Sequence, residues 1–297
     1  FGEKMVMRVF DPEVLVRDFG ELGFSEEDRR HWKEMTAQPS GIILVTGPTG
    51  SGKTTTLYST LKQLATPEVN VCTIEDPIEM IEPSFNQVQV QHAIEMGFAQ
   101  GVRALMRQDP DIIMVGEIRD FETADMAIQA ALTGHLVLST LHTNDAPSAI
   151  TRLLDLGVPA YLLNSTLLGV MAQRLVRTLC PHCRQQAGTR AEDAEAWNRL
   201  VAPWKADAPA QLFHPIGCLE CRMTGYLGRV GIYEILHMSP ALRKLVTGHT
   251  DLARLREAAY RDGMKPLRVS GAIKVGAGTT TMDEVTKVSP PLETTTA

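Results

Sequence analysis

A glycine-rich segment is the most chemically specific feature of this sequence. Residues 47–54 read Gly-Pro-Thr-Gly-Ser-Gly-Lys-Thr and match the pattern G-x-x-x-x-G-K-[ST]. Glycines in such a loop let backbone N–H groups wrap phosphate oxygens, and the N-terminus of a following helix adds positive potential. Lys53 is expected to reach the β- and γ-phosphates, and the hydroxyl of Thr54 is expected to bind Mg²⁺. The expected ATP or ADP contacts are Gly47, Pro48, Thr49, Gly50, Ser51, Gly52, Lys53, Thr54 and Thr55.

Carboxylates follow two other apolar runs. Residues 111–117 (Asp-Ile-Ile-Met-Val-Gly-Glu) resemble a Walker B strand that ends in Gly-Glu, so Glu117 is the candidate acidic group. Residues 73–79 (Thr-Ile-Glu-Asp-Pro-Ile-Glu) place Glu75, Asp76 and Glu79 in a turn broken by proline. Such carboxylates order a metal through water or orient the attacking water, although any one of them is also compatible with a solvated loop. The sequence leaves open which of them is the general base.

Two histidines flank a third apolar run, in residues 134–143 (Gly-His-Leu-Val-Leu-Ser-Thr-Leu-His-Thr). His135 and His142 are seven positions apart, so they are expected at opposite ends of one strand. Polar residues at the carboxyl ends of parallel strands gather where ligands bind. A histidine at a strand end is more often structural, but beside a phosphate-binding loop either one is a candidate sensor of the γ-phosphate.

Four of the five cysteines form two C-x-x-C pairs, Cys180/Cys183 and Cys218/Cys221. Such pairs supply four thiolates that close tetrahedrally on a zinc ion. The 34 residues between the pairs (184–217) exceed the usual spacing of about 15–20, and an inserted helical excursion within 188–211 accounts for the excess. Free thiols or a redox pair are the alternatives. Since four thiolates complete the shell, we expect a structural Zn²⁺, with His182 as a bystander.

The elements that position these groups are expected to alternate between strands and helices. Ser25 can cap a helix, with Asp28 favouring its dipole, and apolar runs bounded by turn residues predict buried strands. Strands are predicted at 41–46, 71–74, 111–115, 136–140 and 230–236, and 86–91 is interpreted as an antiparallel ribbon. Helices are predicted at 25–35, 54–64, 98–107, 122–132, 146–156, 160–176 and 251–262, with another beginning at Ser239-Pro240. This alternation predicts an α/β fold with a mostly parallel sheet.

The two ends of the chain differ from the rest. Residues 4–9 alternate weakly and are interpreted as the last strand of something that began upstream. Because the chain opens at Phe1 and not at Met, we expect that the N-terminal part of a longer protein is missing. Residues 289–297 form a tail rich in proline and threonine, which is predicted to be disordered.

Composition limits the classes of protein that this chain can represent. Its 297 residues are 44% hydrophobic and 22% charged, which excludes wholesale disorder and fits about two domains. The net charge of −6 argues against a protein that mainly neutralises nucleic-acid phosphates, so no nucleic-acid partner is expected. Polar residues interrupt the longest apolar stretch, 160–176, which therefore reads as a buried or amphipathic helix rather than a membrane span. No secretory signal is visible, so we expect a cytoplasmic protein.

Four segments in this order resemble the secretion ATPases of type II secretion and type IV pilus assembly systems. Residues 47–54, 73–79, 111–120 and 134–142 correspond to that family's Walker A, Asp box, Walker B and His box. The four cysteines, residues 228–234 (Gly-Arg-Val-Gly-Ile-Tyr-Glu) and residues 262–264 (Asp-Gly-Met) resemble its C-terminal region. The resemblance covers residues 1–288, nearly the whole chain.

The resemblance implies a RecA-like P-loop ATPase core with further regions on either side. These are the end of an N-terminal domain and linker (1–24), the core (25–178), a tetracysteine zinc module (179–230), a small C-terminal helical region (231–288) and the tail (289–297). It also implies a homo-hexamer in the bacterial cytoplasm, attached to the inner membrane through a platform protein and a cytoplasmic adaptor. ATP turnover would move the domains and drive the assembly of pilin or pseudopilin.

Arginines of the family also map onto this chain. Two arginines late in the family's N-terminal domain reach the phosphates, and Arg8 matches the second, while the first would lie upstream of Phe1. Arg103 and Arg119 match family arginines near the subunit interface or the active site, with plain surface charge as the alternative. Without the upstream arginine and domain, we expect this chain to bind nucleotide but to hydrolyse ATP slowly and form hexamers poorly.

Three other functions are weighed against this one. A pilus retraction ATPase is the nearest, but such proteins as a rule lack the four cysteines. A nucleic-acid translocase or zinc-ribbon nucleic-acid binder is disfavoured by the acidic balance, and salt-dependent DNA binding would revive it. A nucleotide-gated scaffold without turnover is disfavoured by the intact Lys53, Thr54 and Glu117. The sequence does not separate type II secretion from pilus assembly or DNA uptake.

Overall fold

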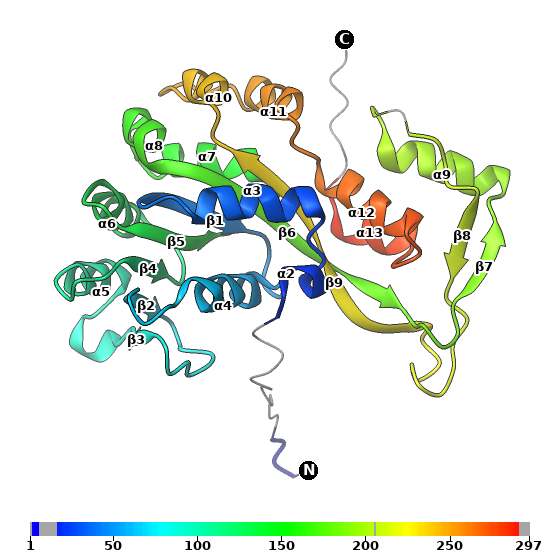
Figure 1. The fold of residues 1–297 in the computed structure, drawn as a ribbon, viewed down its shortest axis with the longest axis horizontal. Coiled ribbons are helices and arrows are strands. Elements are labelled where there is room, and N and C mark those ends of the chain that lie inside the picture. Colours follow the sequence, from blue (N-terminus) through cyan, green and yellow to red (C-terminus); the bar gives the residue numbers. More distant parts are fainter. Residues whose placement is uncertain (1, 6–16, 205, 291–297) are drawn as a thin grey trace.

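The structure is a computed structural model that describes residues 2–5, 17–204 and 206–290. Its centre is a seven-stranded sheet in the order β3-β2-β4-β5-β1-β6-β9 (Figure 1). All neighbours in the sheet pair in parallel except β6 and β9, which are antiparallel. The predicted α/β fold with a mostly parallel sheet is therefore confirmed. The strands are β1 (Gly41–Thr46), β2 (Val71–Glu75), β3 (Asn86–Gln89), β4 (Ile112–Val115), β5 (Leu136–Leu141), β6 (Leu167–Leu179) and β9 (Tyr226–His237).

Helices cover both faces of the sheet, which explains why the central strands β1, β2, β4 and β5 are buried along their whole length. Side chains alternate along β1, so that Ile42 and Leu44 enter one core and Ile43 and Val45 enter the other. The first core is closed by α5 (Phe98–Leu105), α6 (Phe121–Leu132), α7 (Ala146–Asp155) and α8 (Ala160–Thr166). The second is closed by α2 (Phe19–Leu22), α3 (Glu26–Thr36) and α4 (Lys53–Leu64). As predicted, Ser25 caps α3, and Asp28 completes a capping box.

The parallel strands deliver their carboxyl ends to one edge of the sheet. The glycine-rich loop leaves β1 at this edge, residues 76–79 leave β2, Gly116 and Glu117 leave β4, and His142 leaves β5. The topology alone therefore gathers the loop, two acidic segments and one histidine.

Strand β3 corrects one prediction. Residues 86–91 were expected to form an antiparallel ribbon, but Asn86–Gln89 pairs in parallel with β2, with Asn86 opposite Cys72 and Gln89 opposite Glu75. Residues 76–85 carry the chain back along the sheet before β3 begins, so β3 runs in the same direction as β2. The alternation of the sequence indicated a half-buried strand but carried no information about the direction of pairing.

A second prediction, of one helix over 160–176, is also wrong. The helix ends at Thr166, and the chain continues as β6, which pairs with β1 on one side and β9 on the other. Because β6 is covered on both faces over Leu167–Val176, its sequence is mostly apolar, and such a run cannot be told from a buried helix by periodicity.

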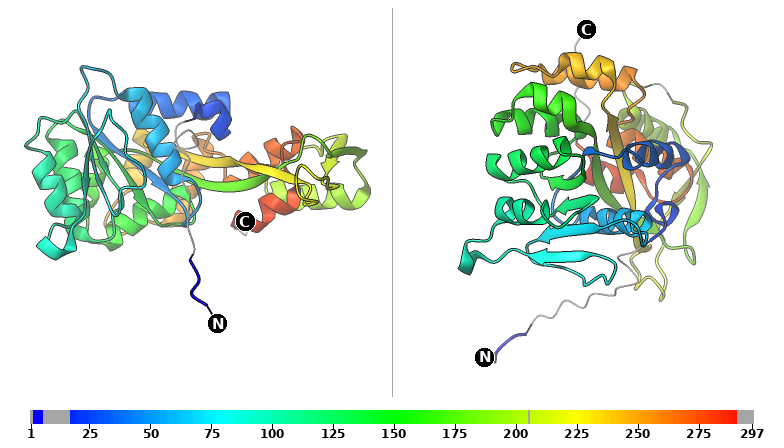
Figure 2. Two further views of the ribbon diagram at one scale, coloured as in Figure 1. Left: turned by 90° about the horizontal axis from the view of Figure 1, so that it is seen from below. Right: turned by 60° about the vertical axis from the view of Figure 1, so that its left-hand side comes forward.

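Beyond the core, β6 and β9 extend away from the rest of the sheet as a two-stranded arm (Figure 2). The arm carries the four cysteines and an insertion made of β7 (Gln185–Gly188), α9 (Ala191–Val201) and β8 (Gln211–His214). The helical excursion predicted between the cysteine pairs is therefore present. After β9 come α10 (Pro240–Leu245), α11 (Leu252–Arg261), α12 (Leu267–Gly276) and α13 (Met282–Val288). Strand β9 spans the predicted boundary at 230/231 and completes the main sheet. The domain limits expected from the sequence remain predictions.

At the two ends, part of the expected structure cannot be compared. Residues 2–5 are not in a strand, and the rest of the strand expected at 4–9, including Arg8, lies outside the described residues. Of the tail, Ser289 and Pro290 are described; the Pro290 carbonyl accepts a hydrogen bond from Arg268 Nε at 2.8 Å. The remainder of the predicted tail lies outside the described residues.

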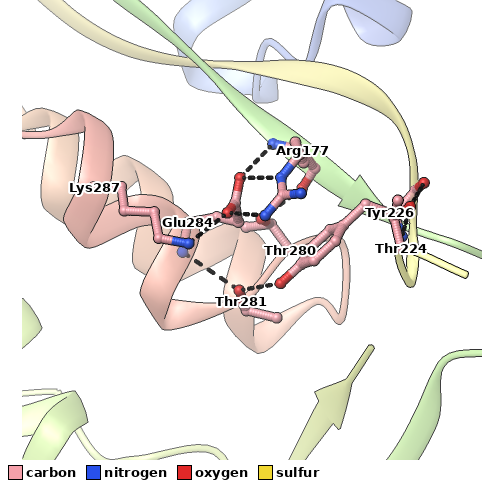
Figure 3. Close-up of polar contacts among 7 residues, drawn as sticks. All are labelled: Arg177, Thr224, Tyr226, Thr280, Thr281, Glu284 and Lys287. Carbon is pink, nitrogen blue, oxygen red and sulfur yellow. Dashed lines mark hydrogen bonds and ion pairs between the residues drawn. The ribbon is translucent and has the colours of Figure 1, made fainter. Parts of the chain in front are cut away.

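An ion pair between the exposed Arg177 and the buried Glu284 fixes the arm to the C-terminal helices (Figure 3). Arg177 on β6 donates from Nε and Nη2 to the Glu284 carboxylate on α13, at 2.9 and 2.7 Å. The Arg177 guanidinium also lies 4.1 Å from the ring centre of Tyr226 on β9. The Tyr226 hydroxyl is 3.0 Å from that of Thr281, and Lys287 adds a second cation at 3.3 Å from Glu284. These contacts hold the pKa of Glu284 at about 2, chiefly through the hydrogen bond from Arg177.

Replacing Glu284 by glutamine should lower the free energy of unfolding at neutral pH by about 2 kcal/mol, because the Arg177 pair is lost. A lowered carboxyl pKa stabilises the folded state above the ordinary value of 4.5, and this contribution fades as pH falls toward 2. The variant should therefore lose less stability than the unaltered protein between about pH 5 and pH 3, measured by denaturant titration at each pH. Glu257→Gln, at an exposed surface pair with Arg261, is the control. Identical pH dependence in the Glu284 variant and the unaltered protein would contradict this account.

Candidate functional site

The glycine-rich loop carries several backbone donors that no backbone acceptor of the described chain occupies. Gly50 and Gly52 adopt positive φ angles of 78° and 89°, which residues with a side chain rarely reach. Within the described chain, the N–H groups of Thr49, Gly50, Gly52 and Lys53 have no backbone partner. The Ser51 hydroxyl oxygen is also buried without a hydrogen-bond partner. Donors left unpaired at the start of α4 are what an anionic phosphate chain requires, so the loop fits the nucleotide predicted for it.

Lys53 folds back over this loop. Its Nζ donates to the carbonyl oxygens of Gly47 at 2.9 Å and Pro48 at 3.1 Å. Burial lowers the pKa of Lys53, whereas Glu117 raises it, Arg174 lowers it and Glu79 raises it again. Lys53 therefore lies in the field of two candidate carboxylates and one buried guanidinium. Thr54 and Thr55 follow in the first turn of α4, partly exposed on the same loop.

Glu117 is the centre of a polar cluster beside the loop. Its carboxylate contacts Arg119 Nη2 at 2.8 Å through Oε2 and His142 Nε2 at 3.3 Å through Oε1. The hydrogen bond from Arg119 to Glu117 raises the pKa of Arg119. The structure thus brings together residues from two boxes of the sequence: Glu117 and Arg119 follow β4, and His142 follows β5.

The two glutamates of the Asp box lie in different environments. Glu75 is buried at the end of β2, where its carboxylate accepts hydrogen bonds from Thr73 and Tyr58, each at 2.7 Å, and from Gln87 at 3.2 Å. Glu79 is exposed, and no hydrogen bond or ion pair occupies it within the described part of the chain. Glu75 is therefore committed to holding the end of β2, while Glu79 is the one that can take up a water.

Two residues predicted for the site lie elsewhere. His135 precedes β5, at the opposite edge of the sheet from His142, and its Nδ1 is 2.8 Å from the Ala130 carbonyl oxygen. A strand rises about 3.3 Å per residue, so β5 separates the two histidines by about 20 Å. The position of His135 does not support a γ-phosphate sensor in this chain. Arg103 is exposed on α5, and no hydrogen bond or ion pair joins it to the cluster among the described residues.

Sequence reasoning missed Gln173 and Arg174, two adjacent polar residues within the apolar run of β6. The Gln173 side chain accepts a hydrogen bond from the Thr56 hydroxyl at 2.9 Å. Arg174 is buried, and a Cβ added to Gly47 would come within 3.0 Å of its Nη1. A buried glutamine and arginine against the phosphate loop were visible in the sequence only as an interruption of an apolar stretch.

The four predicted cysteines form one cluster, whose sulfur atoms all lie within 4.8 Å of one another. Sγ–Sγ distances are 3.8 Å for Cys180–Cys218, 3.8 Å for Cys183–Cys221 and 3.7 Å for Cys218–Cys221. Zinc–thiolate bonds of about 2.3 Å place tetrahedral sulfurs about 3.8 Å apart, whereas a disulfide needs about 2.0 Å. The donor set therefore fits zinc and excludes disulfides in this structure.

Backbone donors surround the sulfurs. N–H groups of Gly217, Cys218 and Gly225 donate to cysteine Sγ atoms at 3.3, 3.2 and 3.2 Å. Such bonds orient thiolates and offset their charge. His182 is exposed and lies outside the group of potential ligands.

Fold and site together define a RecA-like P-loop domain with a four-cysteine cluster and a C-terminal helical region. Residues 1–287 match the Type II/IV secretion system protein family, and the chain belongs to this family. This confirms the resemblance drawn from the four boxes and the cysteines.

Curated relatives fall into two groups of machines. A type IV pilus assembly ATPase, TfpB of Acinetobacter baylyi, is 61% identical over 290 residues, which are 98% of this chain and 49% of the relative. PilB of Myxococcus xanthus, also a type IV pilus assembly ATPase, is 47% identical and covers 96% of this chain and 50% of its own length. Type II secretion system protein E of Dickeya dadantii is 47% identical over 97% of this chain and 56% of its own length. The chain spans about half the length of the curated relatives it matches.

Solved structures give the same fold. The crystal structure of the pilus retraction motor PilT with bound ADP has a TM-score of 0.67 and 29% identity, and it covers 94% of this chain and 68% of that chain. The Legionella pneumophila ATPase DotB has a TM-score of 0.65 and 24% identity over 92% of this chain and 65% of its own, which supports the fold alone. Among the described helices, none has both the length and the apolar character needed to cross a bilayer.

Elemental analysis of the purified chain should find about one zinc per molecule, because four cysteine thiolates satisfy a tetrahedral shell. Chelation should unfold the cysteine module, followed by hydrogen exchange, while the P-loop core stays protected. Cys218→Ser should lower zinc content, whereas Cys72→Ser should retain it, since Cys72 is buried in β2 away from the cluster. A zinc-free preparation whose module is equally stable would show that the cluster is not a metal site.

Proposed function

We propose that this chain is the ATP-hydrolysing motor region of a machine that assembles a type IV pilus or the pseudopilus of a type II secretion system. The observation that supports it best is the arrangement at the carboxyl edge of the sheet. There Lys53 lies on the phosphate loop, and Glu117 bridges His142 and Arg119 beside it. Family membership, with relatives named for pilus assembly and for type II secretion, supplies the biological setting.

Hydrolysis in such a site depends on positioning and charge neutralisation more than on covalent chemistry. The loop N–H groups bind the phosphates, and Lys53 exchanges its carbonyl partners for the β- and γ-phosphate oxygens. Glu117 and Glu79 are the candidates to orient the attacking water, and His142 senses the terminal phosphate through its contact with Glu117. Arg119, held by Glu117, and Arg8 supply positive charge near the γ-phosphate or the subunit interface. Glu75 keeps the end of β2 in place.

Two metals belong to the proposal. Thr54, with water-mediated help from Glu117, would hold Mg²⁺, which when bound neutralises phosphate charge. The four cysteines would hold a structural Zn²⁺ that stabilises the end of the β6–β9 arm. ATP, and ADP as the product, are the nucleotides of the site.

The machine around the chain is also part of the proposal. We expect a homo-hexamer at the cytoplasmic face of the inner membrane, bound there through a platform protein and a cytoplasmic adaptor. Arg103, which lies away from the loop, is left for contacts between subunits. His135, whose ring bonds the Ala130 carbonyl, has a structural role. No nucleic-acid partner is expected.

A pilus retraction motor is the second candidate, because PilT with ADP has the same fold. The four-cysteine cluster favours assembly over retraction. The most similar of the relatives described above, at 61% identity, is likewise named for pilus assembly.

Replacing Lys53 by alanine should abolish ATP hydrolysis and weaken nucleotide binding, since the β- and γ-phosphates lose their nearest point charge. Phosphate release and the affinity for a fluorescent ADP analogue would be measured side by side. Lys62→Ala is a matched control on the same helix, because Lys62 pairs with Glu82 at 2.6 Å and not with the loop. Turnover within a few-fold of the unaltered chain would remove the loop from the mechanism.

The two histidines offer a paired comparison. His142→Ala should lower kcat by about ten- to a hundredfold with little change in nucleotide affinity, because the contact with Glu117 is lost. His135→Ala should leave kcat nearly unchanged, since its ring bonds the Ala130 carbonyl at the far edge of the sheet. The measurement is the steady-state ATPase kinetics of both variants. Equal losses would mean that position relative to the loop does not determine their roles.

A further inference from the structure

The short segment that follows the His box is held by three charged residues from distant elements. The carbonyl oxygen of Asn144 accepts from Arg174 Nη2 at 2.8 Å. The carboxylate of Asp145 pairs with Arg256 Nη2 at 2.7 Å, with both side chains largely buried. The N–H of Ala146 donates to Glu234 Oε1 at 2.8 Å. Three consecutive residues are therefore fixed by β6, α11 and β9.

Glu234 is the most deeply buried of the three, with 3% of its surface exposed. Its second oxygen accepts from the N–H of Leu267 at 3.3 Å. Ala146 and Leu267 are the first residues of α7 and α12, so one carboxylate joins the N-termini of two helices. Burial raises the pKa of Glu234 to about 7, with Asp145 adding to the rise, while these two N–H groups and Arg256 oppose it.

Arg174 connects this cluster to the phosphate loop. Its guanidinium bonds the carbonyl of Asn144 and lies against Gly47, the first residue of the loop. Burial lowers the pKa of Arg174, and the negative charges of Glu234 and Asp145 oppose that change. Arg174 therefore occupies a buried position between the loop and a carboxylate that offsets its charge.

The same segment is tied to β1 on its other side. The N–H of Thr143 donates to the Thr46 hydroxyl oxygen at 2.8 Å, and the Thr46 hydroxyl is 3.0 Å from the Leu141 carbonyl oxygen. His142 thus lies between one anchor on β1 and another on residues 144–146. A shift of residues 144–146 would therefore move the His142 imidazole relative to the Glu117 carboxylate.

We propose that Glu234 is a positioning residue for ATP hydrolysis, which with Arg174 and Arg256 fixes the Asn144–Ala146 segment and thereby sets His142 against Glu117 beside the phosphate loop. The inference rests on the proposed ATPase function. It assigns a role to the Gly228–Glu234 stretch, which family resemblance alone left without one. Because Glu234 also holds the start of α12, the same carboxylate links the nucleotide site to the C-terminal helices.

The test compares Glu234→Ala and Glu234→Gln with the unaltered full chain, using steady-state ATPase kinetics, binding of a fluorescent ADP analogue and thermal unfolding. Glu234→Ala should lower kcat by about ten- to a hundredfold while the affinity for ADP changes by less than about threefold, because the loop donors remain but His142 is misplaced. Glu234→Gln should recover part of kcat, since its amide oxygen still accepts from Ala146 while the charge beside Arg174 is lost.

Glu284→Gln is the matched control. Glu284 is a buried carboxylate of similar exposure, but it pairs with Arg177 on the arm and not with the loop. It should reduce thermal stability and leave kcat near that of the unaltered chain. A split between kcat and affinity in the Glu234 variants, absent from Glu284→Gln, is the result that a purely structural carboxylate would not produce.

Two results would overturn the inference. One is an unchanged kcat in Glu234→Gln and Glu234→Ala; if the alanine variant does not fold, the isosteric glutamine variant decides alone. The other is a parallel loss of kcat, affinity and stability that Glu284→Gln reproduces. An unaltered chain that neither binds nor hydrolyses ATP would instead remove the proposed function, so the two failures are distinguishable.

Discussion

The parallel pairing of β1 with β5 on one side and β6 on the other is the constraint on which the rest of this structure depends. Where β1 ends, the phosphate loop begins; where β5 ends, His142 appears. Strand β6 passes beside the loop at Gln173 and Arg174 and then leaves the sheet to carry the cysteine cluster. A single set of backbone hydrogen bonds therefore fixes the nucleotide site and the root of the β6–β9 arm together.

This arrangement places several charges where water is scarce. Lys53, Arg174 and Glu234 lie within one neighbourhood, and burial opposes the charged form of each. Buried charges of this kind are weak contributors to stability, since removing them from water offsets most of their mutual attraction. Their presence beside a phosphate loop is better explained by a chemical task. A bound nucleotide adds negative charge next to Lys53 and Arg174. It therefore takes over part of the charge compensation that nearby carboxylates give these two cations in its absence.

Local sequence patterns are enough to identify the phosphate loop and the cysteine cluster, but not all of the strands and side chains that surround them. The loop at Gly47–Thr54 was predicted from glycine spacing, and the cysteine cluster from two C-x-x-C pairs, because each motif carries its own geometry. The direction of β3 does not follow from its alternating pattern, which indicates a half-buried strand but not how that strand pairs. Strand β6 is expected as a helix because a mostly apolar run buried on both faces looks alike in either structure. The pairing of Glu234 with Ala146 joins residues far apart in the sequence, so no local pattern could indicate it.

The residues of the candidate site likewise divide into those that a sequence motif indicates and those that only the fold reveals. Glu117 and Arg119 are predicted from one box and His142 from another, and the sheet brings the two boxes together, as the rule for carboxyl ends of parallel strands requires. His135 shares a box with His142, but the two histidines lie at opposite ends of β5. Closeness in the sequence therefore does not place His135 at the nucleotide site. Arg174 was visible only as an interruption of an apolar run, because its partners are backbone carbonyls and a glycine that no residue pattern specifies.

A crystal structure of the chain with Mg²⁺ and a non-hydrolysable ATP analogue tests the central claim most directly. The account predicts that the phosphates occupy the turn of Gly47–Thr54, and that Lys53 Nζ leaves the carbonyl oxygens of Gly47 and Pro48 for the β- and γ-phosphate oxygens. Glu117 and His142 should then face the terminal phosphate from the ends of β4 and β5. A nucleotide bound elsewhere, or a bound nucleotide with Lys53 still on its two carbonyls, would contradict the account.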